Sequence, residues 1–230
     1  MLKQRIMNNN TLYRKYIKRI LDIAVSGVGI TVLSPVYLAL TVTGAISMRG
    51  NPFFVQPRPG KNEKIFNIIK FRSMNNRRDK QGNLLPDEQR LTAYGNFLRN
   101  TSLDELPELF NIFIGDMSVV GPRPLLPEYI PYYTPEEHRR HSVRPGLTGL
   151  AQVNGRNYMT WETKFALDLE YIDSMSFLND LKILLKTVEV TLKHSDIETA
   201  SVIKHDGMVI MPMNIEREMK KKTAGETDSK

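Results

Sequence analysis

Two adjacent carboxylates, Asp104 and Glu105, lie in a segment that carries arginines on both sides of them. The segment is LRNTSLDELPELFNIFIGDMSVVGPRP (98–124), and the arginines are Arg99 and Arg123. An ionised carboxylate can act as a nucleophile or bind a metal ion, and fixed cations beside it suit a substrate that carries phosphate groups. The pattern therefore predicts a catalytic or metal-binding site.

A purely structural role would explain the same pair. Ser102 precedes Glu105 by three residues, which is the spacing of a capping box. Acids in the first turn of a helix also stabilise it through the helix dipole. The two roles are compatible, so the pair predicts a helix start as well as a candidate site.

The residues after the pair predict the elements that position it. Four apolar residues recur at helical spacing and are expected to face a core: Leu106, Leu109, Phe110 and Phe113. Pro107 is tolerated only near a helix start, which places the acids at that end, and Gly115 is expected to end the helix. Pro122 and Pro124 should hold Arg123 on stiff, extended backbone, which suits a clamp for phosphate.

The rest of the chain predicts an α+β fold in which helices dominate. Residues 52–75 are typical of two short strands around a turn, with the candidate substrate-binding cations Lys70 and Arg72 on one face of the second strand. The polar stretch 76–90 is expected to be a surface loop. Further elements are expected as helices at 91–100, 161–171 and 176–196, and as a hairpin about Asp206-Gly207.

A glycine-dense stretch, VRPGLTGLAQVNGRN (143–157), is expected to be a loop that brings backbone amides close to a phosphate or a nucleotide. Its polar side chains are candidates for substrate binding: Arg144, Gln152, Asn154 and Arg156. The stretch matches neither the Walker pattern nor G-x-G-x-x-G, so it does not identify a ligand by itself.

The composition excludes several kinds of site. The 230 residues include no cysteine, which excludes disulfides, thiolate zinc sites and cysteine nucleophiles. The four histidines show no metal-binding spacing, which argues against a transition-metal site. The net charge of +7 favours an anionic partner, such as nucleic acid, a phospholipid surface or a phosphorylated substrate.

An uncharged apolar stretch, residues 23–48, is long enough to enter a membrane. Ser34-Pro35 lies near its middle, where proline removes a backbone hydrogen bond and bends a helix. Basic residues flank both ends, and basic flanks prefer the cytoplasmic face. These features favour a re-entrant helix–break–helix at the cytoplasmic face over a kinked span.

Residues 176–196 form a basic, amphipathic pattern. One face carries apolar residues at helical spacing: Leu178, Leu181, Leu185, Val188 and Leu192. Such a helix can rest on a membrane surface, and it can equally be a core helix with solvated lysines.

Three stretches behind the basic-flanked apolar segment resemble the bacterial sugar transferases. They are KFRSM (70–74), 98–124 and 143–157. The members are small monotopic phosphoglycosyl transferases that start glycan assembly on a polyprenol phosphate, and the chain looks most similar to the bacillosamine-phosphate transferase of bacterial N-glycosylation. We expect a membrane helix in residues 1–50, a catalytic domain in 51–195 and a C-terminal extension in 196–230.

The resemblance implies a reaction and a set of roles. A sugar 1-phosphate would pass from a UDP-sugar to undecaprenyl phosphate, with release of UMP and with Mg²⁺ as cofactor. Asp104 matches the nucleophile that forms a covalent phosphosugar–enzyme, and Glu105 matches its partner in metal binding or site organisation. Lys70, Arg99 and Arg123 match cations near the phosphates. The helix N-terminus and the arginines should hold the pKa of Asp104 low.

The donor sugar and the partners are expectations with open alternatives. The single apolar segment favours an N-acetylated amino sugar, because larger members that act on hexoses carry further transmembrane helices. A hexose-1-phosphate transferase using UDP-glucose or UDP-galactose is the nearest alternative, and a non-catalytic membrane-surface scaffold is the alternative of another class. The expected partners are the UDP-sugar, undecaprenyl phosphate and phospholipid of the bacterial inner membrane, without nucleic acid, and a homodimer stays open.

Overall fold

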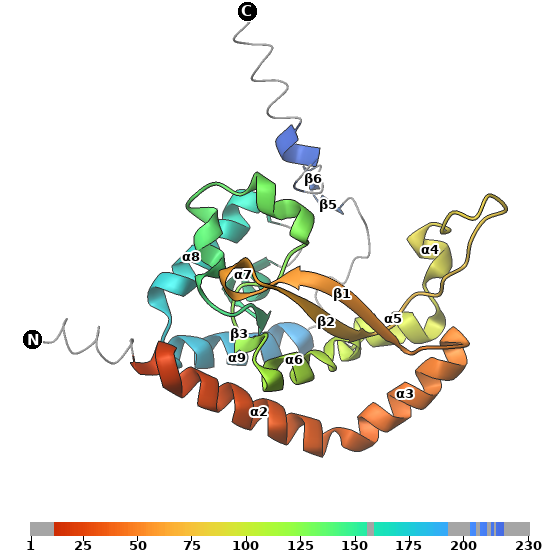
Figure 1. Ribbon diagram of the computed structural model, residues 1–230, viewed down its shortest axis with the longest axis horizontal. Coiled ribbons are helices and arrows are strands. Elements are labelled where there is room, and N and C mark those ends of the chain that lie inside the picture. The colour runs from red at the N-terminus through yellow and green to blue at the C-terminus, as the bar shows by residue number, and fades with distance from the viewer. Residues whose placement is uncertain are drawn as a thin grey trace, which may run out of the picture.

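The computed structural model describes residues 12–155, 159–192, 203–205, 208–210, 213 and 215–218. Helices dominate this part of the chain, and its strands pair into small two-stranded sheets (Figure 1). The α+β class expected from the sequence is therefore confirmed at this level.

The N-terminal apolar stretch forms a bent pair of helices. A π-helical turn, η1 (Tyr13–Ile17), leads into α2 (Lys18–Val32), and α3 (Ser34–Met48) follows after one residue. The pair bends by 63° at the break, where Pro35 takes one of the first positions of α3 and its missing N–H breaks no helical hydrogen bond. The predicted break at Ser34-Pro35 is therefore confirmed. Within the described residues no single helix has the length and apolar character needed to cross a membrane, whereas the bent pair meets both tests together.

The predicted hairpin at 52–75 is confirmed. Strands β1 (Phe53–Pro59) and β2 (Ile65–Phe71) pair antiparallel, and the turn between them contains the 3-10 helix η2 (Lys61–Glu63). A short helix, α4 (Asp87–Arg90), ends the stretch expected to be a loop.

Helix α5 (Ala93–Asn100) begins two residues later than predicted. It begins after Thr92, whose hydroxyl accepts a hydrogen bond from the Gly95 amide at 3.0 Å.

The acidic pair and the apolar residues after it do not form one helix. Asp104 and Glu105 lie in a 3-10 turn, η3 (Leu103–Glu105), and α6 (Glu108–Ile114) follows as a separate helix. The core face of α6 was also predicted wrongly for Phe110 and Phe113, which are 42% and 46% exposed. These two rings lie instead toward the N-terminal helices: Phe110 packs 5.5 Å from the Tyr37 ring, and Phe113 lies beside Gly27.

The glycine-dense stretch is more ordered than the predicted loop, so that prediction was wrong. Strand β4 (Gly146–Thr148) pairs in parallel with β3 (Ser118–Val120), and α7 (Leu150–Gly155) follows directly. The glycines permit this pairing, because a Cβ at Gly146 would lie 2.1 Å from the Gly121 nitrogen. Two 3-10 helices connect the paired strands: η4 (Pro127–Tyr132) and η5 (Glu137–Ser142).

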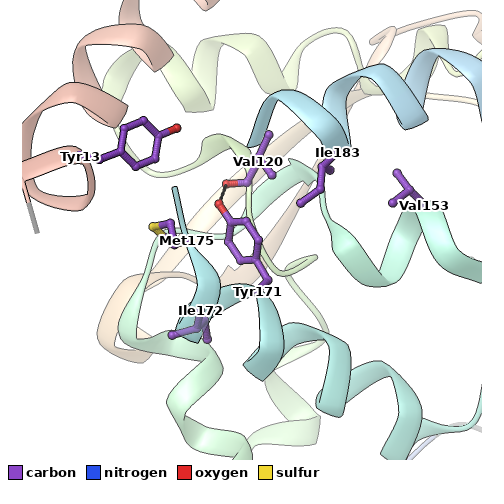
Figure 2. Packing of buried hydrophobic residues seen from close by; sticks show 7 residues of the cluster. All are labelled: Tyr13, Val120, Val153, Tyr171, Ile172, Met175 and Ile183. Atoms are coloured by element: carbon purple, nitrogen blue, oxygen red, sulfur yellow. Dashed lines mark hydrogen bonds between the residues drawn. The ribbon is translucent and has the colours of Figure 1, made fainter. Parts of the chain in front are cut away.

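The C-terminal helices close the main core. Helices α8 (Trp161–Ser174) and α9 (Phe177–Leu192) confirm the two helices predicted there. Figure 2 shows Tyr171 of α8 reaching β3, where its hydroxyl donates to the Val120 carbonyl at 3.1 Å. Tyr13 of η1 belongs to the same cluster, so the core joins the N-terminal helix to α8 and α9.

The predicted apolar face of α9 is not a core face. Its members are between 40% and 73% exposed: Leu178, Leu181, Leu185, Val188 and Leu192. A different stripe, which includes Ile183 and Leu184, packs inward. The core explanation was therefore wrong for this face, and α9 is apolar on two sides. Beyond α9, β5 (Ile203–His205) and β6 (Met208–Ile210) pair antiparallel, which confirms the predicted strand pair. Their expected turn at Asp206-Gly207 lies outside the described residues.

Candidate active site

A cleft of about 890 Å³ contains most of the predicted site residues. The hairpin, α5, η3 and the Pro-Arg-Pro segment contribute the charged wall, and α7 and α9 contribute a less polar wall. The predicted residues that line it are Lys70, Arg72, Arg99, Asp104, Glu105, Arg123 and Gln152. Side chains from distant parts of the sequence thus meet at one place.

Glu105 is restrained by two cations. Lys70 on β2 and Arg123 both approach its Oε1 atom, at 2.8 Å and 2.6 Å. Burial opposes ionisation of Glu105, but the arginine and the lysine outweigh it and hold its pKa well below the ordinary range. Glu105 is therefore an ionised, positioned carboxylate.

A third carboxylate lies behind the pair. Glu108, in the first turn of α6, is buried, and its Oε1 lies 2.9 Å from the Lys70 ammonium. Burial and the negative charge of Glu105 raise the pKa of Glu108 well above its usual range. Burial disfavours charge on Lys70 as well, but Glu105 and Glu108 outweigh this and raise its pKa. The lysine thus joins both glutamates.

Asp104 differs from its neighbour in having no such partner. Among the described residues its carboxylate makes no hydrogen bond and no ion pair, although it lines the same cleft. Burial and the charge of Glu105 raise the pKa of Asp104, and Lys70, Arg123 and Arg99 offset them only in part. The expectation of a lowered pKa was therefore wrong, because burial and the adjacent ionised Glu105 outweigh the cations.

The capping box expected at Ser102 is not formed. Ser102 has a left-handed backbone with φ of 55°, and its side chain makes no capping hydrogen bond to the turn that follows. The Glu105 side chain instead points to Lys70 and Arg123. The purely structural explanation of the acidic pair therefore lacks the contacts that would support it.

Arg123 stands on a rigid support. The Gly121 amide donates to Thr148 and the Gly146 amide donates to Pro122, which continues the β3–β4 pairing up to the arginine. The carbonyl of Arg123 itself accepts a 2.7 Å hydrogen bond from Arg140. This backbone leaves only the side chain free to respond to a substrate.

The remaining arginines of the cleft are less restrained. Arg99 donates through Nε to the Ser73 hydroxyl at 3.0 Å, which leaves its two terminal nitrogens for other acceptors. Arg72 is half-buried and lines the cleft close to Ser73. Both guanidinium groups can therefore meet an anion at the mouth of the cleft.

The structure does not bring every candidate into the cleft. Arg144 donates to the Gly115 carbonyl at 2.7 Å, where it caps the end of α6, as a cation at a helix C-terminus does. Asn154 is engaged by Lys186 at 2.5 Å and by the carbonyl of Leu150 at 2.8 Å. Arg156 lies outside the described residues.

Two residues, one lining the cleft and one buried behind it, were not found from the sequence. Arg58 on β1 binds Gln56 at 2.7 Å, while its buried Nε has no partner in the described part of the chain. The sequence contains a signal for Arg58, because this arginine stands between two prolines, as Arg123 does. Glu108 could have been found as the third acid of LDELPEL, one helical turn after Glu105.

Residues 13–194 match the bacterial sugar transferase family. The chain belongs to this family. The match includes every residue of the charged wall, so the resemblance inferred from the sequence motifs is confirmed.

Several relatives within the sugar transferases have assigned names. The uncharacterized sugar transferase EpsL of Bacillus subtilis is 48% identical over 183 residues, which cover 79% of this chain and 90% of EpsL. The UDP-glucose:undecaprenyl-phosphate glucose-1-phosphate transferase of Caulobacter vibrioides is 38% identical, covering 74% of this chain and 68% of that protein. The undecaprenyl-phosphate galactose phosphotransferase of Salmonella typhimurium is 35% identical, covering 82% of this chain but only 43% of its own length.

The cleft offers few ligands for a metal ion. The described residues contain no group of three or more acidic or histidine side chains arranged to hold one. Asp104 and Glu105 provide two adjacent carboxylates, and Mg²⁺ is commonly held by one or two carboxylates together with substrate phosphates and water. The donor set of this sugar transferase therefore fits a Mg²⁺ ion that arrives with a phosphorylated substrate.

Proposed function

We propose that this protein transfers a hexose 1-phosphate from a UDP-hexose to undecaprenyl phosphate and releases UMP. The observation that carries the proposal is the contrast between Asp104 and Glu105. One carboxylate is held by two cations, while the other is free of partners among the described residues and faces the same cleft. A nucleophile needs that freedom, and a positioned neighbour does not.

The first step joins the sugar phosphate to the enzyme. A carboxylate oxygen of Asp104 attacks the phosphorus that carries the sugar, and the bond from that phosphorus to the bridging oxygen of the diphosphate breaks. UMP leaves with the bridging oxygen and its electron pair. Lys70, Arg99 and Arg123 line the cleft where this negative charge develops and would stabilise it.

The second step regenerates the enzyme. An oxygen of the acceptor phosphate attacks the phosphorus of the aspartyl phosphosugar, and the bond from phosphorus to Asp104 breaks. The aspartate leaves as a carboxylate, and the acceptor becomes a sugar-linked diphosphate. Both steps use one nucleophilic position, which divides a difficult transfer into two easier ones.

The names of the relatives favour a hexose over the expected amino sugar. One relative is named as a glucose-1-phosphate transferase and another as a galactose phosphotransferase. We therefore take UDP-glucose or UDP-galactose as the donor of this chain.

We propose Mg²⁺ as the cofactor. Asp104 and Glu105 would hold it together with the phosphates of the donor, and the ion would neutralise part of the charge on the diphosphate. Glu105 can serve this role because Lys70 and Arg123 reach only its Oε1 atom.

We propose that the bent α2–α3 pair enters the cytoplasmic face of the cell membrane and returns. The pair exposes many apolar side chains, including Val28, Val32 and Leu38. The exposed face of α9 adds an apolar, lysine-flanked surface of the kind that binds at a bilayer interface. Such an arrangement would place the cleft near the headgroup of a lipid acceptor.

A donor-only experiment tests the covalent step. Purified protein incubated with UDP-hexose and Mg²⁺, without acceptor, should release about one UMP per active site and gain the mass of a hexose phosphate on Asp104. Asp104→Asn should abolish both results, while Asp116→Asn, outside the cleft, should leave them unchanged. An adduct on any other side chain would refute the assignment.

A panel of donors tests the sugar. UMP release with undecaprenyl phosphate present should be at least tenfold faster with UDP-glucose or UDP-galactose than with UDP-N-acetylglucosamine or UDP-bacillosamine. The reverse order would restore the amino-sugar expectation. Absence of turnover with every donor would favour the non-catalytic scaffold.

A further inference from the structure

A short C-terminal helical segment packs back onto the chain beyond the region shared with the family. It comprises Met213 and residues 215–218, whereas the family match ends at residue 194. Figure 1 shows it at the end of the molecule away from α2 and α3. We call it the C-terminal segment.

The C-terminal segment is anchored by a buried methionine. Met213 is 0% exposed and belongs to a cluster with Tyr133, Trp161 and Phe165. Trp161 and Phe165 lie on α8, which also carries Asp168. The methionine therefore packs on the helix that carries Asp168, the partner of Arg140.

An ion pair fixes the other end of the C-terminal segment. Arg217 donates to both carboxylate oxygens of Glu137, at 2.6 Å and 2.8 Å, and also to the carbonyl of Tyr132. The side chains of the pair are only 15% and 10% exposed. A forked, mostly buried pair of this kind restrains both partners.

Glu137 lies on the same 3-10 helix, η5, as a residue that touches the site. Arg140, three positions later, is buried and pairs with Asp168 at 2.7 Å. The same guanidinium donates to the carbonyl of Arg123, whose own side chain holds Glu105. A continuous line of polar contacts and one short helix thus connects Arg217 to the cleft.

We propose that the C-terminal segment positions Arg123, so that Met213 and Arg217 are positioning residues for the transfer reaction. This inference rests on the proposed function, because the reaction provides the readout. Loss of the Arg217–Glu137 pair removes one of the contacts that hold η5, and the support of the Arg123 carbonyl then loosens. Displacement of a charged group by about 1 Å can lower a rate by as much as a hundredfold.

The test uses the full chain and two independent readouts. Trp161 is the only tryptophan, so its emission reports whether Met213 and Arg217 are docked. Arg217→Ala should shift this emission and lower kcat for UMP release about tenfold, with a smaller change in KM for the UDP-sugar. Arg217→Lys should have a kcat between those of Arg217→Ala and the wild type, because lysine keeps the positive charge but not the forked hydrogen bonds. Arg139→Ala is the matched control, since Arg139 lies on η5 but pairs with the exposed Glu136 and Asp173.

A double-mutant cycle separates positioning from general loss of structure. If Arg217 acts through Arg123, Arg217→Ala should have at most a threefold effect in an Arg123→Lys background. Met213→Ala provides a second route to undocking, should Arg217→Ala not fold.

The other possible results would overturn either the positioning role or the proposed function. An unchanged Trp161 emission, a shifted emission with wild-type kcat, or additive effects in the cycle would overturn the positioning role. Absence of UMP release by the wild-type protein would overturn the proposed function, and this inference with it.

Discussion

Replacing Asp180 by alanine should loosen the docking of the N-terminal helix on the catalytic core. Asp180, on α9, accepts hydrogen bonds from the Tyr13 hydroxyl at 2.5 Å, the Lys18 ammonium at 2.5 Å and the Tyr171 hydroxyl at 2.8 Å. The side chains of Lys18 and Asp180 are 11% and 7% exposed. Removal of the carboxylate therefore leaves a nearly buried ammonium group and the Tyr13 hydroxyl without their acceptor, while the Tyr171 hydroxyl keeps the Val120 carbonyl.

The expected loss follows from this burial. Breaking a buried ion pair by removing one partner costs about 3–5 kcal/mol, and the unsatisfied Tyr13 hydroxyl adds to the loss. We expect Asp180→Ala to lower the free energy of unfolding by about 4 kcal/mol and Tm by about 10 °C. Thermal unfolding of the protein in detergent micelles, followed by circular dichroism, measures both.

Two further variants are controls for the loss of the buried charge. Asp173→Ala removes an exposed pair with Arg139 and should cost less than about 1 kcal/mol. The double variant Lys18→Met, Asp180→Leu removes both charges and should regain part of the loss, because no buried charge is left unpaired. If Asp180→Ala costs no more than Asp173→Ala, the network does not hold the helix.

Further variants test a close backbone approach at Gly95 and the pH dependence of stability at His141. Gly95→Ala should destabilise the protein by about 1–3 kcal/mol in urea unfolding, because its Cβ would lie 1.8 Å from the Ser73 carbonyl oxygen. Gly50→Ala, with open space around it, should change stability by less than about 0.5 kcal/mol. Equal effects of the two variants would contradict the close approach at Gly95. Burial, assisted by Arg140, lowers the pKa of His141 from 6.5 to about 4. The unfolded chain then binds more protons than the folded one between pH 6.5 and about 4, so this histidine should lower stability as the pH falls through that window, by about 3 kcal/mol. His141→Gln should remove that part of the pH dependence. Urea unfolding at several pH values measures this, and the reasoning is wrong if the free energy of unfolding of the variant falls with pH as steeply as that of the wild type.

Local patterns predicted most elements of the fold. The Ser34-Pro35 break, the hairpin at 52–75 and the helices α8 and α9 rest on proline chemistry, turn residues and apolar spacing, which act within a few residues. These signals do not depend on distant parts of the chain, and the structure bears them out.

Two of the errors share one physical cause, which is contact between distant segments. The stretch 143–157 has the composition of a loop, but pairing with β3 turns its first half into a strand. Phe110 and Phe113 have helical spacing, which defines a face of α6 but not the neighbour of that face. The neighbour proved to be the N-terminal helix pair, which no local pattern of α6 could reveal.

At the candidate site too, local sequence patterns found the residues, and contacts between distant segments decide how they differ. Spacing and residue type singled out Asp104 and Glu105 together, yet gave no reason to assign them different roles, because they are chemically similar and adjacent. The difference arises from Lys70 on β2 and from Arg123, which both reach Glu105 and leave Asp104 without a partner among the described residues. Only the folding of the hairpin and of the Pro-Arg-Pro segment against η3 produces that asymmetry. Lys70→Met removes one of the two cations that hold Glu105. We therefore expect it to raise the pKa of Glu105 and to reduce the difference in pKa between Glu105 and Asp104.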